Sequence, residues 1–521
     1  MIDSMTHIAK QHGSLIASLL STDWYTHPID DLQLIETHIS WVILTGPYAY
    51  KIKKPIDLGF LDFSTLAKRR FFCEEELRLN QRTAASIYLE VLPITGTVER
   101  PKLGGEEEVI EYAVKMRQFP QEAQLDRMLG NNALTVQHMD AFARLVAEFH
   151  AQIAVADTTL SFGDPEHVVQ PIEENFEQIR ECIKSIDAIQ ILDAIEKWSL
   201  EQYKILLPLL EQRKQQGYIR ECHGDMHLRN LAWIDNKPVA FDCIEFNANL
   251  RWIDVISEIA FLVMDLQDRQ QPELAQRFLN AYLEITGDYK GIRLLPFYAV
   301  YRALVRAKVN AIRLNQDTLE DKERDSINQE FVGYLRLAQS YIEGREKRLI
   351  ITRGLSGSGK STLTQSLPEK INAIRLRSDV ERKRLAGMKS SESSQAKPGE
   401  GIYAKNFSDE TYQHLLDIAG KIIDAGFSVI VDATFLEKEK RDMFRRLAKE
   451  KKVSFTILDF VASTDILRQR IQQRKHDVSD ADLAVLQQQL DNLKPLSKNE
   501  MPYVTSIDTE TVNEVSSDLF Q

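Results

Sequence analysis

The sequence predicts two domains of different fold class: an α+β domain over residues 1–345 and an α/β domain over residues 346–521. The chain has 521 residues, well above the length of one typical domain, so more than one folding unit is expected. Before residue 345, short apolar runs come first and a long region of helical periodicity follows, which favours α+β. After it, short apolar runs alternate with polar helical stretches, which favours a parallel sheet with crossover helices.

The apolar runs give the expected strands. In the N-terminal domain three runs are candidate strands: residues 42–44, 49–53 and 112–116. Residues 231–234 and 238–241 are expected to pair as a hairpin around a turn at 235–237. In the C-terminal domain five runs predict a five-stranded parallel sheet: residues 348–352, 373–376, 427–431, 455–460 and 504–507. A helix is expected over residues 361–367, directly after the first of these strands.

Composition and charge exclude several classes of protein. The formal net charge is −12, which gives no general attraction to nucleic acid or to an anionic membrane surface. The four cysteines form no C-x-x-C pair, which argues against a disulfide framework and a structural zinc site. The apolar run near the N-terminus is too short for a signal sequence or a membrane span. The sequence therefore predicts a cytoplasmic protein without membrane attachment.

A glycine-rich motif, Gly-Leu-Ser-Gly-Ser-Gly-Lys-Ser, occupies residues 354–361 between an expected strand and an expected helix. Such a loop wraps its backbone N–H groups around phosphate oxygens, and glycines supply the positive φ angles that this requires. Lys360 would place its charge on the β- and γ-phosphates, and Ser361 would offer its hydroxyl to Mg²⁺. The motif predicts binding of ATP, with GTP as the alternative, together with Mg²⁺. The expected phosphate cradle comprises Gly354, Leu355, Ser356, Gly357, Ser358, Gly359, Lys360, Ser361 and Thr362.

Three further elements of the C-terminal domain carry charged candidates. Asp432 ends an apolar strand, where a second Mg²⁺ ligand is expected. Asp379 and Arg382 stand three apart on the opening turn of a helix and could meet one ligand. Arg470 and Arg474 share a helix face and could neutralise phosphate charge. The alternatives are a turn aspartate for Asp432, a helix cap with a surface arginine for the second element, and a solvated basic face for the third.

A second constellation lies in the N-terminal domain, where residues 223–230 read His-Gly-Asp-Met-His-Leu-Arg-Asn and Asp242 follows the predicted hairpin. Asp225 and Asn230 stand five apart, as do the catalytic aspartate and the metal-binding asparagine of the kinase loop. Asp225 would orient or deprotonate an acceptor hydroxyl, while Asn230 and Asp242 would hold Mg²⁺. The alternative is a polar turn. We expect the two histidines to hold the loop by hydrogen bonds, because no third zinc ligand has suitable spacing.

The C-terminal motifs GLSGSGKS, SDVERKRL, VIVDATF and LRQRIQQR lie within about residues 348–510. Together they resemble the P-loop kinase-like group that includes zeta-toxin-type and polynucleotide-kinase-type phosphotransferases. The resemblance implies that Asp379, paired with Arg382, is the general base for a substrate hydroxyl. It also implies that Arg470 and Arg474 contact the nucleotide phosphates beside Lys360.

Residues of about 35–340 resemble the aminoglycoside-phosphotransferase and choline-kinase branch of the kinase-like fold. The resemblance rests on the H-G-D-x-x-x-x-N loop and the aspartate that follows it: His223, Gly224, Asp225, Asn230 and Asp242. It implies that a strand lysine and a helix glutamate form an ion pair that grips the phosphates. Lys51 and Glu76 are the candidates for this pair, with Lys53 and Glu75 as alternatives. It further implies that Met116 lies where the strand leads to the adenine hinge.

Two departures from that branch concern the nucleotide cover and the metal loop. No G-x-G-x-x-G segment precedes Lys51, and Asp242 begins Asp-Cys-Ile-Glu instead of D-F-G. As a whole, the chain resembles bacterial proteins described as bifunctional aminoglycoside phosphotransferase/ATP-binding proteins. That description does not identify aminoglycosides as the substrate.

The sequence therefore predicts an ATP- and Mg²⁺-dependent phosphotransferase with two nucleotide sites and unidentified small-molecule or nucleotide acceptors with a hydroxyl group. One alternative is a nucleotide-gated regulatory protein in which only the P-loop domain is catalytic. Another is a nucleic-acid end kinase, which the net charge of −12 disfavours. The sequence predicts neither acceptor and no oligomeric state.

Overall fold

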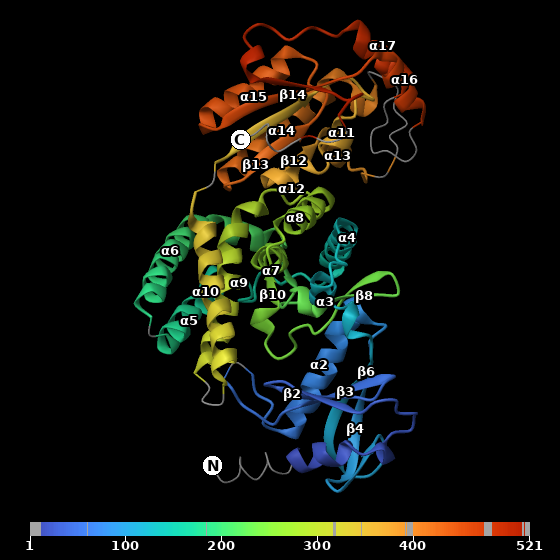
Figure 1. Ribbon diagram of the computed structural model, residues 1–521, viewed down its shortest axis with the longest axis vertical. Coiled ribbons are helices and arrows are strands. Elements are labelled where there is room, and N and C mark those ends of the chain that lie inside the picture. The colour runs from blue at the N-terminus through green and yellow to red at the C-terminus, as the bar shows by residue number, and fades with distance from the viewer. Residues whose placement is uncertain are drawn as a thin grey trace. The chain divides into compact units, whose positions relative to one another are not determined.

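The computed structural model describes residues 12–59, 61–183, 185–315, 319–344, 346–390, 392, 400–473, 482–512 and 515. Figure 1 shows the helices and strands of the chain. The contacts within the chain divide it into two compact units that alternate along the sequence. The first comprises residues 1–141, 148–171 and 207–262, and the second comprises residues 142–147, 172–206 and 263–521. The boundary predicted at residue 345 stays a prediction. Among the described helices, none combines the length and the apolar composition that a membrane crossing requires.

An antiparallel six-stranded sheet belongs to the first unit, in the order β1-β2-β3-β6-β4-β5. Its strands are β1 (Gln33–Glu36), β2 (Ser40–Leu44), β3 (Tyr48–Lys53), β4 (Tyr88–Thr97), β5 (Arg100–Leu103) and β6 (Val109–Arg117). Strands β2, β3 and β6 confirm the three predicted ones. The sequence analysis did not predict the other three strands. Strand β1 is exposed at every residue, and β4 contains Pro93 and Gly96, which are uncommon inside strands.

Helix α2 (Leu66–Ala84) packs on this sheet and begins at Thr65, whose hydroxyl accepts a hydrogen bond from the N–H of Lys68. Such an N-cap satisfies one of the free N–H groups at the start of a helix. The buried residues of α2 include Cys73, Glu76 and Asn80, which recur at helical spacing along one face. Glu76 is therefore held on the side of the helix that is closed to solvent.

The rest of the first unit carries the predicted hairpin, formed by β8 (Leu231–Ile234) and β9 (Lys237–Ala240). Its turn residues Asp235 and Asn236 have φ of 50° and 59°, as a two-residue type I′ turn requires. The N–H of Phe241 donates to the carbonyl of Asn230 at 3.0 Å, which brings the two ends of the hairpin together. Two further strands pair antiparallel: β7 (Ile219–Glu221) and β10 (Trp252–Asp254).

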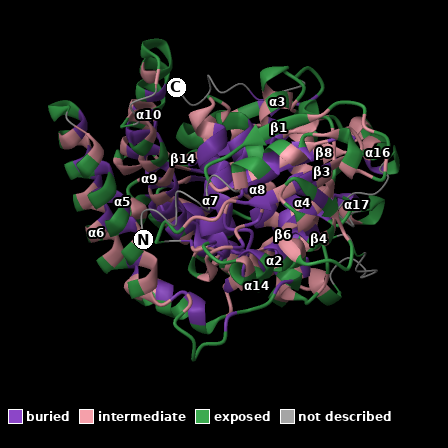
Figure 2. Ribbon diagram, turned by 90° about the horizontal axis from the view of Figure 1, so that it is seen from below, coloured by how far each residue is buried: buried purple, intermediate pink, exposed green. Residues whose placement is uncertain are grey.

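Four long helices contribute residues to both units: α4 (Val136–Gln152), α5 (Pro165–Cys182), α6 (Ile186–Gln215) and α7 (Val255–Asp268). Helix α7 is buried along most of its length (Figure 2). Just before it, Asp254 forms a buried two-point ion pair with Arg213, at 2.6 and 2.9 Å, and also accepts from the N–H of Ile256. The carboxylate of Asp254 thus fixes the start of α7.

The helical part of the second unit continues with α8 (Pro272–Thr286), α9 (Leu295–Leu314) and α10 (Asp321–Ile342). Helix α8 has a proline in its first turn and ends at Gly287, whose φ is 73°. These two signals are the usual ones for the start and the stop of a helix. A short helix, α3 (Leu125–Gly130), belongs to the first unit.

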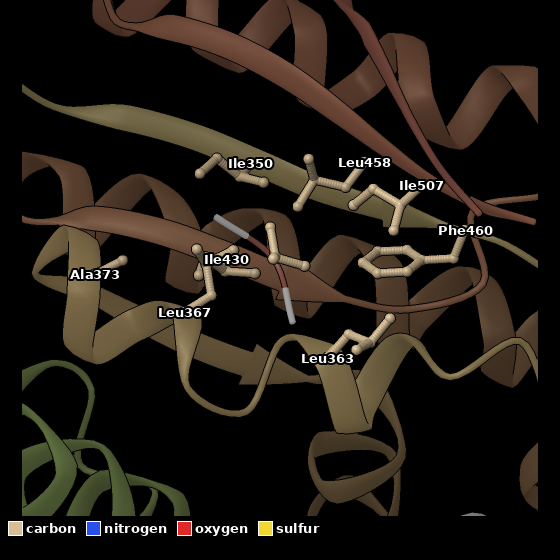
Figure 3. Packing of buried hydrophobic residues seen from close by; sticks show 9 residues of the cluster. Ile350, Leu363, Leu367, Ala373, Ile430, Leu458, Phe460 and Ile507 are labelled. Atoms are coloured by element: carbon tan, nitrogen blue, oxygen red, sulfur yellow. The ribbon is translucent and has the colours of Figure 1, made fainter. Parts of the chain in front are cut away.

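A five-stranded parallel sheet forms the rest of the second unit, in the order β12-β13-β11-β14-β15. Its strands are β11 (Arg348–Arg353), β12 (Ala373–Arg377), β13 (Ser428–Asp432), β14 (Ser454–Val461) and β15 (Val504–Asp508). All five predicted strands and their parallel arrangement are confirmed. Figure 3 shows the core on one face, where Ile350, Ile430 and Leu458 meet Leu363 and Leu367.

The helices of this sheet are α11 (Lys360–Leu363), α12 (Leu367–Ile371), α13 (Ser378–Leu385), α14 (Lys405–Asp424), α15 (Lys438–Lys451), α16 (Thr464–Gln473) and α17 (Leu483–Asp491). Short 3₁₀ turns are η1 (Thr22–Trp24), η2 (Gln121–Ala123), η3 (Leu228–Asn230), η4 (Ala248–Leu250), η5 (Gly291–Leu294), η6 (Gly401–Tyr403) and η7 (Met501–Tyr503). The single helix predicted over 361–367 is wrong. The first helix ends at Leu363, and a second begins at Leu367 with Pro368 in its first turn.

A buried ion pair joins α15 to the segment before η7, where the guanidinium of Arg441 donates to both carboxylate oxygens of Glu500 at 2.6 and 3.2 Å. Burial by itself would raise the pKa of Glu500, but hydrogen bonds from Arg441 and Ser497 lower it from 4.5 to about 2. A carboxyl whose pKa is lowered by folding stabilises the folded state above its ordinary pKa. That stabilisation is lost as the pH falls toward the folded-state value.

Glu500→Gln is therefore expected to lower the free energy of unfolding by about 3–5 kcal/mol near pH 7, because it leaves the buried Arg441 charge unpaired. The deficit relative to wild type should shrink as the pH falls from 4.5 toward about 2, where Glu500 itself becomes neutral. Thermal unfolding of both proteins across this range measures it. Glu450→Gln, at an exposed position of α15, is the control. A deficit that does not change with pH would contradict the assignment.

Candidate functional site

The first candidate site is centred on two lysines of β3. Lys51 and Lys53 alternate with Ile52 and so lie on the same face of the strand. The ammonium group of Lys51 is 2.8 Å from one carboxylate oxygen of Glu76, and that of Lys53 is 2.7 Å from the other. One buried carboxylate therefore serves both lysines.

The second partner of each lysine separates their roles. The ammonium group of Lys51 also lies 2.6 Å from the carboxylate of Asp242, whereas that of Lys53 contacts the buried Glu245. Lys53 is fully buried, and 11% of the Lys51 side chain is exposed. The structure thus brings together the predicted residues Lys51, Glu76 and Asp242 and encloses Lys53 behind them.

The charges of this cluster reinforce one another. Burial opposes ionisation of Glu76, but the ammonium groups of Lys51 and Lys53 outweigh it and hold the pKa of Glu76 well below its usual range. Burial would lower the pKa of Lys51, yet the carboxylates of Asp242 and Glu76 raise it well above its usual value. Glu76 is consequently an anion and Lys51 a cation throughout the physiological pH range. The alternative Glu75 lies outside the cluster, where it pairs with Arg78 at 2.8 Å.

The loop that carries Asp225 is closed by its own side chains. The amide of Asn230 donates to the carboxylate of Asp225 at 2.8 Å and to its carbonyl at 3.0 Å. His223 lies 2.8 Å from the carbonyl of Phe241 through Nε2, and Nε2 of His227 lies 3.3 Å from the Asp225 carboxylate. The two histidines thus contact groups within the loop and the hairpin, as the sequence predicts.

A buried glutamate of α7 anchors the same loop from behind. One carboxylate oxygen of Glu258 accepts from the N–H of His223 at 2.6 Å, and the other accepts from the N–H of Gly224 at 2.9 Å. Gly224 has φ of 88°, and a Cβ there would lie 2.8 Å from the carbonyl of Leu250, so only glycine fits. Glu258 therefore fixes the backbone from which the Asp225 side chain projects.

Asp242 adopts a left-handed backbone with φ of 63°, which is uncommon for residues other than glycine, although aspartate and asparagine adopt it more often than most. Its N–H donates to the hydroxyl of the buried Tyr88 at 3.2 Å. Its side chain is 45% exposed and reaches Lys51. Met116 lies on β6 and pairs with Ala49 of β3, so it belongs to the sheet that carries the lysine.

Carboxylate and amide oxygens on Asp242 and Asn230 form a donor set that suits a hard divalent cation such as Mg²⁺. A different group, His150, Cys222 and Glu258, places three ligand atoms within 4.8 Å of one another. It does not suit a metal, because burial raises the pKa of the Cys222 thiol, which donates to the Ile253 carbonyl at 3.6 Å. Both oxygens of Glu258 already accept backbone N–H groups.

The second candidate site is the glycine-rich loop after β11. Gly354, Gly357 and Gly359 have φ of 152°, 85° and 80°. A Cβ on Gly354 would lie 2.7 Å from the carbonyl of Phe460, so this position requires glycine. The ammonium group of Lys360 donates to the carbonyls of Gly354 and Leu355, both at 2.9 Å.

The rest of the cradle lies around this lysine. The N–H of Ser356 donates to the Gln489 side chain at 2.8 Å, and Ser358 is buried against Lys360. Ser361 and Thr362 are exposed in the turn of α11 that follows. The loop therefore presents hydroxyls outward while its lysine folds back onto the loop itself.

Asp432 at the end of β13 has an arginine partner that the sequence analysis did not assign. The guanidinium of Arg375 is 2.7 Å from the carboxylate of Asp432 and also donates to the carbonyl of Ser361 at 3.1 Å. Burial opposes ionisation of Asp432, but Arg375, Arg377 and Lys360 lower its pKa. The oxygen that contacts Arg375 is engaged, so Ser361 is the more accessible of the two predicted metal ligands in this site.

The remaining charged candidates have different surroundings. Arg470 donates to Thr509 at 2.8 and 2.7 Å, and its Nη1 lies beside the backbone of Gly359. Arg474 lies outside the described residues. Asp379 and Arg382 both lie on α13, where the guanidinium of Arg382 donates to the Ile402 carbonyl at 3.0 Å and stacks over the Tyr403 ring.

Comparison with known proteins matches both halves to families. Residues 98–295 match the phosphotransferase enzyme family, and residues 349–496 match the AAA domain family. The uncharacterized protein Rv2004c of Mycobacterium tuberculosis is 30% identical over 463 residues, which cover 87% of this chain and 89% of the relative. This chain belongs to the same family. It is a fusion of a kinase-like phosphotransferase domain with a P-loop kinase-like domain, as the sequence predicts.

Two solved structures resemble parts of this phosphotransferase fusion. Amicoumacin kinase hAmiN is 13% identical and covers 64% of this chain and 96% of its own, with a TM-score of 0.40. A gluconokinase from Sinorhizobium meliloti 1021 is 19% identical and covers 32% of this chain and 86% of its own, with a TM-score of 0.23. At these TM-scores neither likeness bears on what the fusion protein does.

Sequence reasoning missed several residues that build the two sites of the fusion protein. Glu245 carried a signal, since it is an apolar-flanked acid three residues after Asp242. Arg375 and Arg377 also carried one, because two arginines alternate along an otherwise buried strand. Glu258 carried none, because its role depends on contacts with a loop more than thirty residues away in the chain.

The separate partners of the two lysines in the fusion protein allow a direct prediction. Lys51→Met is expected to lower nucleotide-dependent turnover at the first site by about 10²-fold, since Lys51 is the lysine that reaches Asp242. Lys53→Met should instead mainly lower the melting temperature, because it leaves the buried Glu76 and Glu245 short of a cation. Turnover and thermal unfolding of both variants test this. The reverse pattern would make Lys53 the phosphate-binding lysine.

Proposed function

We propose that the protein is a phosphotransferase with two ATP- and Mg²⁺-dependent sites, each transferring the γ-phosphate to a hydroxyl of a small-molecule or nucleotide acceptor. The observation that carries this proposal is the position of Lys51, whose ammonium group bridges Glu76 and Asp242 at 2.8 and 2.6 Å. A lysine held between a helix glutamate and a metal-binding aspartate is the arrangement that kinase-like enzymes use on nucleotide phosphates.

At the first site, Asp225 would accept or orient the proton of the acceptor hydroxyl, and Asn230 and Asp242 would hold the metal ion. The hydrogen bond from Asn230 to Asp225 supports this assignment, because it ties the base to the metal-binding side chain at 2.8 Å. A bound Mg²⁺ would neutralise charge that develops on the transferred phosphoryl group. Lys51 would add a second positive charge from the strand side.

At the second site, Lys360 would move from the loop carbonyls onto the β- and γ-phosphates, with Ser361 offered to the metal ion. Asp379 would take the proton of the acceptor hydroxyl. The cations Arg375 and Arg470 lie beside this loop and support binding of an anionic nucleotide. GTP is the alternative nucleotide. We also propose that the protein acts in the cytoplasm, because none of its four cysteines forms a disulfide bond.

Incubation of the full-length protein with γ-labelled ATP, Mg²⁺ and a metabolite extract tests the proposal, with phosphorylated products identified by mass spectrometry. Wild type should form labelled products, and Asp225→Ala, Asp379→Ala and Lys360→Ala should each remove a subset. A protein that neither binds nor turns over nucleotide with Mg²⁺ would refute it. Products that depend on Lys360 but not on Asp225 would favour the regulatory alternative, and labelled 5′-hydroxyl oligonucleotides would favour an end kinase.

A further inference from the structure

Within the described part of the chain, strand β12 is the outermost strand of the parallel sheet and pairs with β13 on one side only. Its other edge presents the carbonyl of Ala373 and the N–H of Arg375, which a further strand would normally satisfy. The side-chain amide of Asn280 on α8 takes both. It donates to the carbonyl of Ala373 at 3.0 Å and accepts from the N–H of Arg375 at 2.8 Å. Gln276 adds a second donor to Ala373 at 2.7 Å.

A single amide therefore occupies the position of a neighbouring strand's peptide group. Free edges of this kind are sites of unwanted pairing, and a covering helix is one of the ways proteins close them. These contacts lie within the second unit. They hold β12 in place against α8, and β12 leads directly into α13, the helix that carries Asp379.

The end of α8 also holds the residues on both sides of that junction. Glu284 lies 3.0 Å from the guanidinium of Arg377, the last residue of β12, and its carbonyl accepts from Arg384 of α13. A Cβ on Gly287 would lie 2.7 Å from Nε of Arg384, so the chain passes directly against this side chain. Near the start of α12, Glu369 pairs with Arg277 at 3.3 Å.

The contacts that α8 makes with α13 fall on one face of that helix. Arg384 pairs with Glu381 three residues before it, and these two lie on the side that meets the end of α8. Asp379 and Arg382 are also three apart, but the 3.6-residue period places them on the opposite side of the helix. Helix α8 therefore contacts α13 on the face of Arg384, and the face that carries the proposed base Asp379 points away from α8.

We propose that α8 is a positioning element of the P-loop phosphotransfer site: Asn280 and Glu284 hold β12, Arg377 and α13 so that Asp379 is correctly placed. The inference rests on the proposed function of that site. Helix α8 lies within the residues matched by the phosphotransferase family and outside those matched by the AAA family. The P-loop site is thus completed by a helix that its own family does not supply.

The charge of Glu284 has a specific role in this arrangement. Arg377 is the register partner of Asp432 and stands two residues before Asp379, and its guanidinium forms an ion pair with Glu284 of α8. Glu284 draws that guanidinium toward α8. When Glu284 is neutral, this ion pair is lost, and the segment from Arg377 to Asp379 is held less firmly.

The test uses the full chain with Asp225→Asn, so that hydrolysis of ATP with Mg²⁺ reports the P-loop site alone. Glu284→Gln should lower kcat at least about tenfold while KM for ATP stays within about twofold, because the base moves and the phosphate loop does not. Glu284→Asp should recover part of the loss. Glu273→Gln, at an exposed position in the first turn of α8, is the matched control and should equal its parent.

Hydrogen exchange on the same proteins separates failure of this inference from failure of the proposed function. Asn280→Leu should raise exchange at the Arg375 amide and along α13 by at least about tenfold, whether or not the parent hydrolyses ATP. If the parent neither hydrolyses ATP nor forms labelled products from the metabolite extract, the proposed function fails at this site and exchange alone decides the positioning role. Unchanged exchange, or a Glu284→Gln variant whose kcat stays within about twofold of an active parent, would overturn it.

Discussion

Lys360→Ala is expected to lower ATP turnover at the P-loop by about 10²–10³-fold, the largest effect of any single side chain in that site. Two losses combine. The variant removes the cation that would face the β- and γ-phosphates, and it removes the donor that now binds the carbonyls of Gly354 and Leu355 at 2.9 Å. The loop therefore loses an internal hydrogen-bond donor as well as a ligand for the nucleotide.

The measurement is steady-state ATP hydrolysis in the full chain with Asp225→Asn, together with nucleotide affinity by calorimetry. Lys449→Ala, at an exposed position of α15, is the control and should equal its parent. Lys360→Arg should recover little, because a planar guanidinium does not replace a compact ammonium group inside a glycine-rich loop. Turnover within about threefold of the parent would remove Lys360 from the phosphate site.

Asp225→Asn is expected to lower phosphotransfer at the first site by about 10²–10⁴-fold, the range that a positioned general base contributes. The isosteric amide keeps the size of the side chain and removes the negative charge that accepts from Asn230 at 2.8 Å. Nucleotide binding should persist, because the ion pair of Lys51 with Glu76 does not involve Asp225. The loss should consequently appear in kcat and not in the affinity for ATP.

The experiment compares kcat and nucleotide affinity of this variant with those of Asp187→Asn, whose exposed side chain lies in the first turn of α6. To isolate the first site, both are made in the Lys360→Ala background. Equal kcat values for the two variants would show that the first site does not transfer phosphate through Asp225. The kinase-like domain would then be better described as a nucleotide sensor.

Much of the P-loop half could be predicted from sequence because its signals are local. Each buried strand is a short apolar run in the sequence. The glycines of residues 354–361 predict a loop with positive φ angles. The hairpin around Asp235 could also be predicted, because two apolar runs flank a short polar turn. The exposed strand β1 was not, because it lacks the apolar alternation that marks a half-buried strand.

The choice between Lys51 and Lys53 could not be made from sequence. Residues two apart on a strand share a face, so both lysines were equally placed toward Glu76. What separates them is the position of Asp242 and Glu245, which lie about 190 residues later in the chain. The contact of α8 with the edge of β12 could not be predicted from sequence for the same reason, because Asn280 and Arg375 are 95 residues apart.

The amide of Asn280 also bears on how this gene can be divided. A fragment that begins near residue 346 would keep all five parallel strands but leave the outer edge of β12 without its cover. An open edge next to the buried Ile374 and Leu376 is a template for pairing between copies. A fragment that starts near residue 346 is therefore expected to aggregate. A fragment that includes α8, or the full chain, should avoid this.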